Sequence, residues 1–278
     1  MPILPVDDPD DPRLADYRAV PDPVLLRQRG LFAAESRLVV RELLTHPRLR
    51  TRSLLLTEAA LASLGDLLSA PDDPRPIYVG SQALLKRVIG YSVHRGSLAL
   101  GERPAPVTDR RLPALATARL VLALEQVGNP DNVGSIFRNA AAFGAGCVLL
   151  TPDCADPLYR KAIRTSLGAT LRVPYAELDD WPASLDRLRA LGYVTVALTP
   201  DASAEPLEAL AADPPTRVAL VLGTEGAGLS DRAVDAVDRR ARIPIADGVD
   251  SLNVATATGI ALYRLATVSP ARHPPGVS

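Results

Sequence analysis

Five polar side chains in the second half of the chain could together bind and orient a polar ligand. In chain order they are Asn132, Arg138, Glu225, Ser251 and Asn253. Each has a structural explanation on its own, because the asparagines and the serine could cap helices and the arginine could lie on a solvated helix face. Helix capping does not explain why three expected strand-to-helix junctions all combine amides, hydroxyls and glycines. The combination therefore indicates a ligand site.

The middle junction, residues 218–230, is an apolar strand of the buried type that runs into three glycines. Glycines at such a place let the backbone approach a ligand closely and adopt positive φ. The spacing of Gly223, Gly226 and Gly228 does not give the dinucleotide fingerprint, and no Lys-Ser/Thr pair follows as in a Walker loop. The missing fingerprint argues against a nicotinamide-dependent oxidoreductase. The missing Walker pattern and Glu225, which would repel a phosphate, argue against a nucleotide-phosphate site.

The elements that must position these side chains alternate between strands and helices after about residue 119. Such alternation predicts a mostly parallel sheet covered by helices, with ligands bound beyond the carboxyl ends of the strands. Strands are expected over residues 119–124, 147–150, 193–198, 217–222 and 242–245. Helices are expected over residues 133–143, 157–166, 181–191, 230–237 and 253–265.

The first part of the chain predicts a second, smaller α/β domain, which shows helical spacing and short apolar strands. Asp and Pro dominate the first 22 residues and indicate a flexible leader, and the polar, Pro-containing stretch after residue 101 indicates a linker. The expected organisation is a leader at 1–22, domains at 23–101 and 119–268, a linker at 102–118 and a tail at 269–278.

Composition restricts the class of protein. Two cysteines, Cys147 and Cys154, cannot build a disulfide framework or a four-cysteine metal site, and we expect no metal and a cytoplasmic location. The start of the chain lacks the pattern of a signal peptide, and no apolar run is long enough to cross a membrane.

The net charge of -1 gives no global attraction to nucleic acid. Lys86 and Lys161 are the only lysines, and the arginine excess suits phosphate contacts, although a GC-rich genome is the favoured explanation for it.

In their order and spacing, the three junctions resemble the three motifs of the SpoU (TrmH-like) branch of the SPOUT superfamily, RNA 2′-O-ribose methyltransferases. The motif Asn-x-Gly-x-x-x-Arg corresponds to Asn132, Gly134 and Arg138, and Gly-x-Glu-Gly-x-Gly corresponds to residues 223–228. The third motif, Ile-Pro followed by Ser-Leu-Asn-Val-Ala, begins at Ile243 and ends at Ala255.

The N-terminal half is more loosely similar to the family's L30e-like domain, at residues 32–40 and 94–96. The family usually has Glu-Gly where this chain has Glu35-Ser36. The resemblance implies an α/β fold in which a C-terminal SPOUT domain has a parallel sheet and a deep trefoil knot, a feature nearly absent from other proteins. A small N-terminal α/β L30e-like domain would bind the RNA substrate.

The resemblance also implies S-adenosylmethionine as co-substrate, held largely by backbone. The residues at the corresponding positions are Leu198, Gly223, Ile243 and Leu252. Asn132, Glu225, Ser251 and Asn253 would fix the donor and the nucleotide. Arg138 would bind phosphate or act as general base, and the former is physically easier because guanidinium stays protonated. A homodimer through the knotted domain is expected.

The expected substrate is structured RNA, with 23S ribosomal RNA favoured and transfer RNA as the alternative. Thiopeptide-resistance enzymes that methylate ribosomal RNA have the same layout. A different class, a non-catalytic RNA-binding assembly factor, also remains open. Methyl transfer from a sulfonium requires no Lewis acid, so the chemistry implies no metal.

Overall fold

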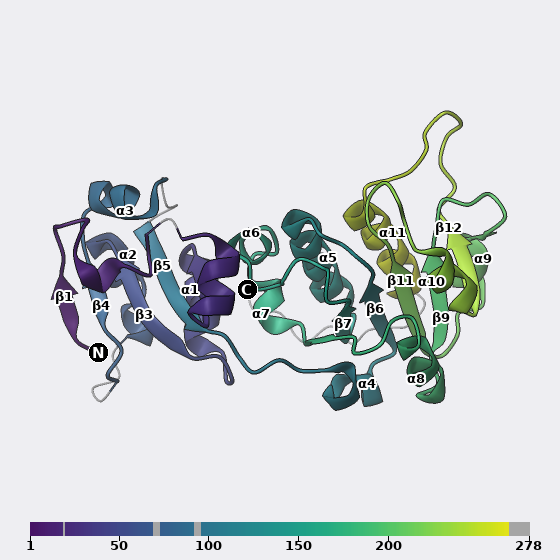
Figure 1. The fold of residues 1–278 in the computed structure, drawn as a ribbon, viewed down its shortest axis with the longest axis horizontal. Helices are drawn as coiled ribbons and strands as arrows, with labels where there is room; N and C mark the ends of the chain where they lie inside the picture. Colours follow the sequence, from purple (N-terminus) through teal and green to yellow (C-terminus); the bar gives the residue numbers. More distant parts are fainter. Residues whose placement is uncertain (19, 69–72, 92–95, 267–278) are drawn as a thin grey trace. The chain divides into compact units, whose positions relative to one another are not determined.

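The computed structural model describes residues 1–18, 20–68, 73–91 and 96–266. The chain forms two compact units (Figure 1). Unit 1 comprises Met1–Ala105 and Asp156–Arg172, and unit 2 comprises Pro106–Ala155 and the chain from Val173 onward. The division after Ala105 lies close to the predicted linker, whereas the segment 156–172, expected within the C-terminal domain, groups with unit 1. Residues 94–95 and the predicted tail lie outside the described residues.

Unit 1 is built on a five-stranded mixed sheet with the order β1-β4-β3-β5-β2. Strands β1, β4 and β3 are parallel, and β5 runs antiparallel to both β3 and β2. The strands are β1 (Ile3–Pro5), β2 (Leu31–Glu35), β3 (Thr51–Leu56), β4 (Ile77–Val79) and β5 (Ser97–Glu102). The α-helices are α1 (Arg37–Thr45), α2 (Glu58–Ser63), α3 (Gln82–Ile89), α6 (Arg160–Thr165) and α7 (Ala169–Arg172). Shorter helical turns are η1 (Pro12–Leu14), η2 (Val24–Gln28) and η3 (Gly65–Leu67).

Several residues of the first 22 pack into unit 1. Strand β1 pairs with β4, and Leu14 and Tyr17 are almost completely buried. The Tyr17 hydroxyl lies 2.6 Å from the hydroxyl of Ser53 in β3. The prediction of a flexible leader over residues 1–22 is therefore wrong. Composition was a poor guide because a few well-placed apolar side chains suffice to anchor a segment that is otherwise rich in Asp and Pro.

Segment 156–172 is held in unit 1 by arginine contacts. The Arg160 amide donates to Asp22 Oδ2 at 2.9 Å, and Arg160 Nη1 donates to the Tyr91 hydroxyl at 3.0 Å. Arg172 Nη1 donates to Glu42 Oε2 at 3.0 Å. Sequence periodicity could not reveal these contacts, because the partners lie far from the segment along the chain.

Unit 2 is built on a seven-stranded sheet with the order β10-β12-β9-β11-β6-β7-β8, and all paired neighbours are parallel. The predicted α/β class with a parallel sheet is confirmed. The strands are β6 (Leu120–Leu124), β7 (Cys147–Leu150), β8 (Tyr175–Glu177), β9 (Val194–Leu198), β10 (Glu205–Pro206), β11 (Val218–Leu222) and β12 (Arg239–Arg242). The helices are η5 (Asp109–Arg111), α4 (Ala114–Thr117), α5 (Pro130–Phe143), α8 (Ser184–Ala190), α9 (Leu207–Ala212), α10 (Asp231–Ala236) and α11 (Val254–Ala266).

The centre of the unit 2 sheet consists of β6 and β11, in which every residue is buried. Uninterrupted apolar runs of this kind are expected for strands covered on both faces. Their register pairs Leu222 with Leu124, so the carboxyl ends of both strands meet at one edge. Helix α11 packs against α5. The trefoil knot stays a prediction of the family resemblance.

The predicted strand at 242–245 lies earlier than expected, because β12 ends at Arg242. Pro244 has no amide hydrogen to donate to a neighbouring strand, which is consistent with pairing that stops before it. Helix α5 also begins earlier than the predicted residue 133. Asn129 caps it by accepting from the Asp131 amide at 2.9 Å, and Pro130 occupies the first helical position.

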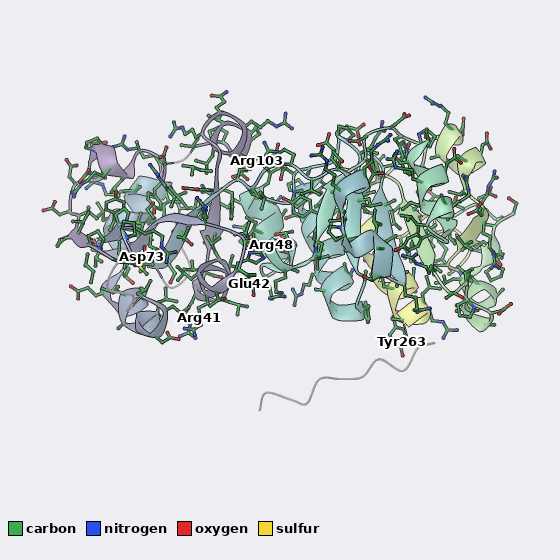
Figure 2. All side chains as sticks on the ribbon, turned by 90° about the horizontal axis from the view of Figure 1, so that it is seen from below. Arg41, Glu42, Arg48, Asp73, Arg103 and Tyr263 are labelled. Atoms are coloured by element: carbon green, nitrogen blue, oxygen red, sulfur yellow. The ribbon has the colours of Figure 1, made fainter. Side chains whose placement is uncertain are left out.

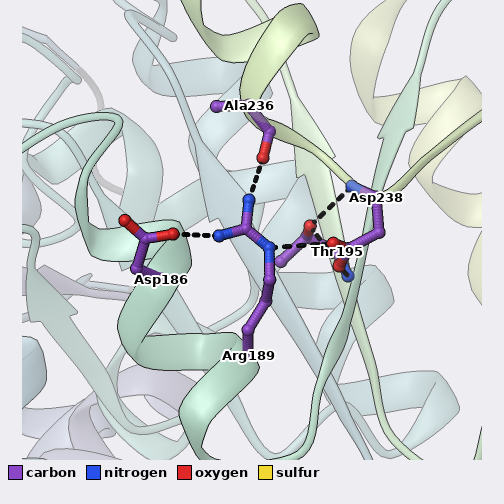
Figure 3. A network of polar contacts seen from close by, with 5 residues as sticks. All are labelled: Asp186, Arg189, Thr195, Ala236 and Asp238. Carbon is purple, nitrogen blue, oxygen red and sulfur yellow. Dashed lines mark hydrogen bonds and ion pairs between the residues drawn. The ribbon is translucent and has the colours of Figure 1, made fainter.

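A polar network fixes the start of β12 beside β9 (Figure 3). The amide and hydroxyl of Thr195 each donate to Asp238 Oδ2 at 2.8 Å, and Arg189 Nε donates to Asp238 Oδ1 at 2.8 Å. Arg189 also donates to Asp186 and to the carbonyl of Ala236. Burial raises the pKa of Asp238, but the hydrogen bonds from Thr195 and Arg189 outweigh it and hold that pKa below its ordinary value.

Within the described ranges, no helix combines the length and hydrophobicity that crossing a membrane requires.

Candidate functional site

A cavity of about 420 Å³ opens at the carboxyl ends of β9 and β11 and beside the chain that follows β12. All four residues expected to hold the methyl donor line it, namely Leu198, Gly223, Ile243 and Leu252. Three of the other expected site residues, Glu225, Ser251 and Asn253, also line it. The rest of the wall consists of Thr199, Pro200, Leu222, Thr224, Gly226, Gly228, Ile245, Val254 and Ala257.

The glycine segment after β11 folds back on itself to form one wall of this cavity. The Gly228 amide donates to the Thr224 carbonyl at 3.0 Å. A Cβ atom on Gly223 would overlap the backbone of Gly228, so only glycine fits there. Gly226 and Gly228 have φ values of +84° and +72°, which residues with a Cβ atom rarely adopt. The sequence requirement for glycine is therefore steric at one position and conformational at the other two.

Asn253 connects the three sequence motifs. Its Nδ2 donates to Asn132 Oδ1 at 3.0 Å and also to Glu225 Oε1. Its Oδ1 accepts from the amides of Ala255 and Thr256, at 3.0 and 3.1 Å, and so caps α11. This one side chain can therefore cap a helix and also take part in a ligand site, because its amide oxygen and its amide nitrogen face different partners.

The other two candidate caps do not cap helices in this way. Asn132 lies inside α5 and is 6% exposed, with Asn129 at the cap position. Ser251 precedes the capping residue, is exposed and lines the cavity. The structural explanation thus holds for Asn253 and not for Asn132 or Ser251.

Arg138 is separate from this cluster. It lies in the middle of α5, is exposed and does not line the cavity. Its guanidinium makes no hydrogen bond or ion pair with any residue that the structure describes. An exposed cation without an internal partner can bind an anionic group from outside.

Sequence reasoning missed Glu125, which directly follows β6 and is 3% exposed. The carboxylate accepts hydrogen bonds from Trp181 and Ser230. A carboxylate directly after a buried apolar strand was the available signal, because a charge at such a position requires partners.

The two cysteines are free thiols. Burial raises the pKa of the Cys147 thiol to about 12, so this thiol is protonated at neutral pH and is no nucleophile. In the part of the chain that the structure describes, no group of three or more His, Cys, Asp or Glu side chains is arranged to hold a metal ion.

Comparison with known proteins adds a family and relatives. Residues 119–263 match the SpoU rRNA Methylase family. An uncharacterized tRNA/rRNA methyltransferase of Mycobacterium bovis is 43% identical over 262 residues, which cover 92% of this chain and 89% of that protein. The 23S rRNA (guanosine-2′-O-)-methyltransferase RlmB of Acinetobacter baylyi is 31% identical over 188 residues, 66% of this chain and 75% of that protein.

A solved structure resembles the whole chain. The AdoMet-bound rRNA methyltransferase from Sinorhizobium meliloti superposes with a TM-score of 0.78 at 24% identity, covering 95% of this chain and 97% of that one. The family match includes the segments of all three motifs.

Proposed function

The chain belongs to the SpoU rRNA methylase family, and on that premise we propose that it methylates a ribose 2′-hydroxyl of structured RNA, most favourably 23S ribosomal RNA. The resemblance predicted from the three motifs is confirmed, and the chain is a methyltransferase that uses S-adenosylmethionine. One observation carries the ribose assignment: Asn253 joins Asn132 and Glu225 at the wall of the cavity that the expected donor-binding residues line.

The cavity suits the donor in size and chemistry. Its volume of about 420 Å³ falls within the usual range for small-molecule sites. Apolar side chains such as Leu198 and Ile243 offer contacts to a nucleoside, and the glycine segment lets backbone approach closely. Glu225 at the wall is suited to the positive charge of a sulfonium.

The reaction joins the ribose 2′-oxygen to the donor methyl carbon as the carbon–sulfur bond breaks; the sulfur leaves as a neutral thioether, and the hydroxyl proton passes to solvent water. In-line attack requires both partners to be held in register. We assign that positioning to Asn132, Ser251 and Asn253. The exposure of Arg138 and its lack of a described partner support a role in binding RNA phosphate. A general-base role would require a guanidinium to lose its proton near neutral pH.

Two features of relatives bear on the substrate. RlmB is named as a 23S rRNA enzyme, which supports ribosomal RNA. The name of the Mycobacterium bovis protein includes tRNA and rRNA, so transfer RNA is the second candidate. A resistance-type rRNA enzyme is included in the first assignment, whereas an assembly factor without catalysis is the alternative of a different class.

Unit 1 is proposed to bind the RNA, as an L30e-like substrate domain. Several of its arginines are exposed and form no ion pair with a residue that the structure describes; Arg48 is labelled in Figure 2. They are Arg27, Arg37, Arg48, Arg50 and Arg87. Unpaired guanidinium groups are suited to phosphate contacts, and they offset locally a net charge of -1 for the chain.

A homodimer through unit 2 is also proposed. Ile260 and Tyr263 of α11 are 36% and 54% exposed, and the Tyr263 ring contacts Phe143 of α5 edge to face. Figure 2 shows Tyr263 at the surface of this unit. The two helices line a shallow depression that includes Gly259 and Thr256. An exposed apolar face of this kind is typical of a protein interface.

The test of function is transfer of tritium from labelled S-adenosylmethionine to 23S, 16S and transfer RNA, offered both as free RNA and, for the ribosomal RNAs, as ribosomal subunits. Asn132→Ala serves as the blank. Label in the 23S fraction supports the proposal, and label in transfer RNA alone replaces the substrate. Donor binding without label in any fraction would favour the assembly factor.

A further inference from the structure

The buried carboxylate of Glu125 lies outside the residues that line the cavity, at the carboxyl end of β6. It is 3% exposed, and no lysine or arginine forms an ion pair with it among the residues that the structure describes. A buried charge without a counter-ion is costly unless hydrogen bonds satisfy it. Three donors do so here. Oε1 accepts from Trp181 Nε1 and from the Ser230 hydroxyl, both at 2.6 Å, and Oε2 accepts from the Ser230 amide at 2.8 Å.

The glycine segment is formed by residues 223–229, and the residues on either side of it both contact Glu125. The Glu125 amide donates to the carbonyl of Leu222 at 2.8 Å, immediately before Gly223. The Glu125 carboxylate holds Ser230, just beyond the segment. Backbone and side chain of one residue therefore close the base of the loop formed by residues 223–229.

Between these two anchors lie the loop residues that face the cavity. Glu225, which contacts Asn253, is among them. The loop is short of side chains that could hold it otherwise, because three of its residues are glycines. The Gly228–Thr224 backbone bond closes the loop on itself, and the two ends set where the loop lies, so a ligand that binds to its backbone requires those ends to be fixed in advance.

We propose that Glu125 is a positioning residue for S-adenosylmethionine binding, because it clamps both ends of the glycine loop. The inference rests on the proposed placement of the donor in the cavity. Glu125 does not touch the donor; it acts through Leu222 and Ser230.

The substitution Glu125→Gln isolates this role, because it keeps the shape and removes one acceptor. A carboxamide has one acceptor oxygen and two N–H donors. In one orientation its NH₂ faces the Ser230 amide, and in the other it faces the Trp181 indole N–H. Either way a donor meets a donor, at the Ser230 amide in the first orientation and at the Trp181 indole in the second, so the set of three hydrogen bonds that the carboxylate accepts is broken.

The experiment is titration of S-adenosylmethionine into the full-length protein by calorimetry, combined with steady-state kinetics. Glu125→Gln should raise the Kd and the KM for the donor at least tenfold, with kcat at saturating donor within about threefold of wild type. Amide exchange measured by mass spectrometry should increase in the peptide that contains residues 223–231. RNA affinity should not change.

Two variants control the result. Asp109→Asn removes another buried carboxylate of unit 2, one that pairs with Arg187, and should lower the melting temperature without weakening donor binding. Ala257→Phe fills the cavity itself and should abolish donor binding. If Glu125→Gln folds poorly, Ser230→Ala provides a milder test, because it keeps the amide bond to Glu125 and removes the hydroxyl bond together with the cap that the hydroxyl forms with the Ala233 amide of α10; it should raise the Kd about threefold.

The outcomes separate the inference from its premise. Donor affinity within twofold of wild type in Glu125→Gln and Ser230→Ala, with binding lost in Ala257→Phe, would overturn the clamp and leave the donor site standing. Unchanged affinity in Ala257→Phe would overturn the proposed donor site and the clamp with it. If Asp109→Asn weakened donor binding as much as Glu125→Gln does, the effect of Glu125 would be one of general stability, and the clamp would be overturned.

Discussion

Asn253 shows how a single side chain can serve both the fold and the site. One end of its amide caps α11, and the other end meets Asn132 and Glu225. Aspartate would keep the capping oxygen and replace the donor with a second carboxylate beside Glu225. The two functions can therefore be separated by substitution.

Asn253→Asp should retain thermal stability within a few degrees but lower methyl transfer at least a hundredfold, because like charges would meet where an amide now donates. Asn253→Ala should lose both, with about 1 kcal/mol of stability from the missing cap. Melting temperature and initial rate of methyl transfer check this for both variants. An Asn253→Asp protein as active as wild type would contradict a role in methyl transfer for the contacts of Asn253 with Asn132 and Glu225.

Arg138 allows a test of its proposed phosphate contact. Arg138→Ala should weaken RNA binding about tenfold or more and leave the Kd for S-adenosylmethionine unchanged, because the side chain does not line the cavity. Arg138→Lys keeps the charge and should retain most of the RNA affinity and measurable turnover. RNA affinity that is intact in Arg138→Lys while turnover at neutral pH is lost would favour the general-base role instead.

At the scale of elements, Ser36 joins β2 to α1 with a φ of +84° and ψ of 152°. Serine is strained in this region of backbone space, and glycine is not. The structure thus gives a physical reason for the Glu-Gly pair that is usual in the family at this position. The neighbouring Glu35 is buried and accepts from the Tyr91 hydroxyl at 2.9 Å, so the junction is fixed on one side.

Ser36→Gly should therefore raise the free energy of unfolding of unit 1 by about 1 kcal/mol. Ser36→Ala is the matched control, because alanine carries the same Cβ strain and should give no gain. Thermal denaturation of the two variants against wild type measures the effect. Equal stability of Ser36→Gly and Ser36→Ala would contradict the strain argument.

The network at the start of β12 predicts a dependence on pH. The pKa of Asp238 is lowered in the folded state, so its contribution to stability is fully present above the unfolded pKa, about 3.9, and is lost as pH falls through the folded value. Asp238→Asn should lower stability at pH 7 by about 2 kcal/mol, as expected when hydrogen bonds to a charged group are removed. The difference in melting temperature from wild type should shrink below about pH 4. A difference that stays constant with pH would contradict this assignment.

The elements that the sequence predicted well are those with long, uniform apolar runs. The strands expected at 119–124 and 217–222 correspond to β6 and β11, which each begin one residue later than predicted and end at the predicted residue. Short strands such as β8 and β10 escaped prediction, because two or three residues show no periodicity. The predicted start of α5 is three residues late, because Asn132 also fits the pattern of a cap, although Asn129 and Pro130 form the stronger signal.

At the scale of the whole molecule, the motifs revealed the family but not the contacts that join distant segments. The seven-stranded order places β11 between β9 and β6, and no local pattern specifies that order. The placement of segment 156–172 in unit 1 and the clamp at Glu125 likewise depend on partners distant in sequence. The family resemblance identified residues of the cavity wall; Leu198 and Gly223 lie at or directly after the carboxyl ends of β9 and β11, which a parallel sheet brings together.

We expect the protein to associate into a homodimer. The protein should have a dimer mass in light scattering at micromolar concentration. Ile260→Glu with Tyr263→Glu should give a monomer, because both side chains are exposed apolar groups on α11. Leu38→Glu, at an exposed position of unit 1, is the control and should remain dimeric. A monomer mass for the wild type would contradict the proposed homodimer.

Mass spectrometry of nucleosides from RNA treated with the protein and S-adenosylmethionine determines directly whether the protein methylates a ribose. RNA from wild-type reactions should contain one 2′-O-methylated ribonucleoside that is absent after treatment with Asn132→Ala. The methyl group should remain on the ribose fragment. A methyl group on the base instead, or no methylated nucleoside in any RNA offered, would contradict the account.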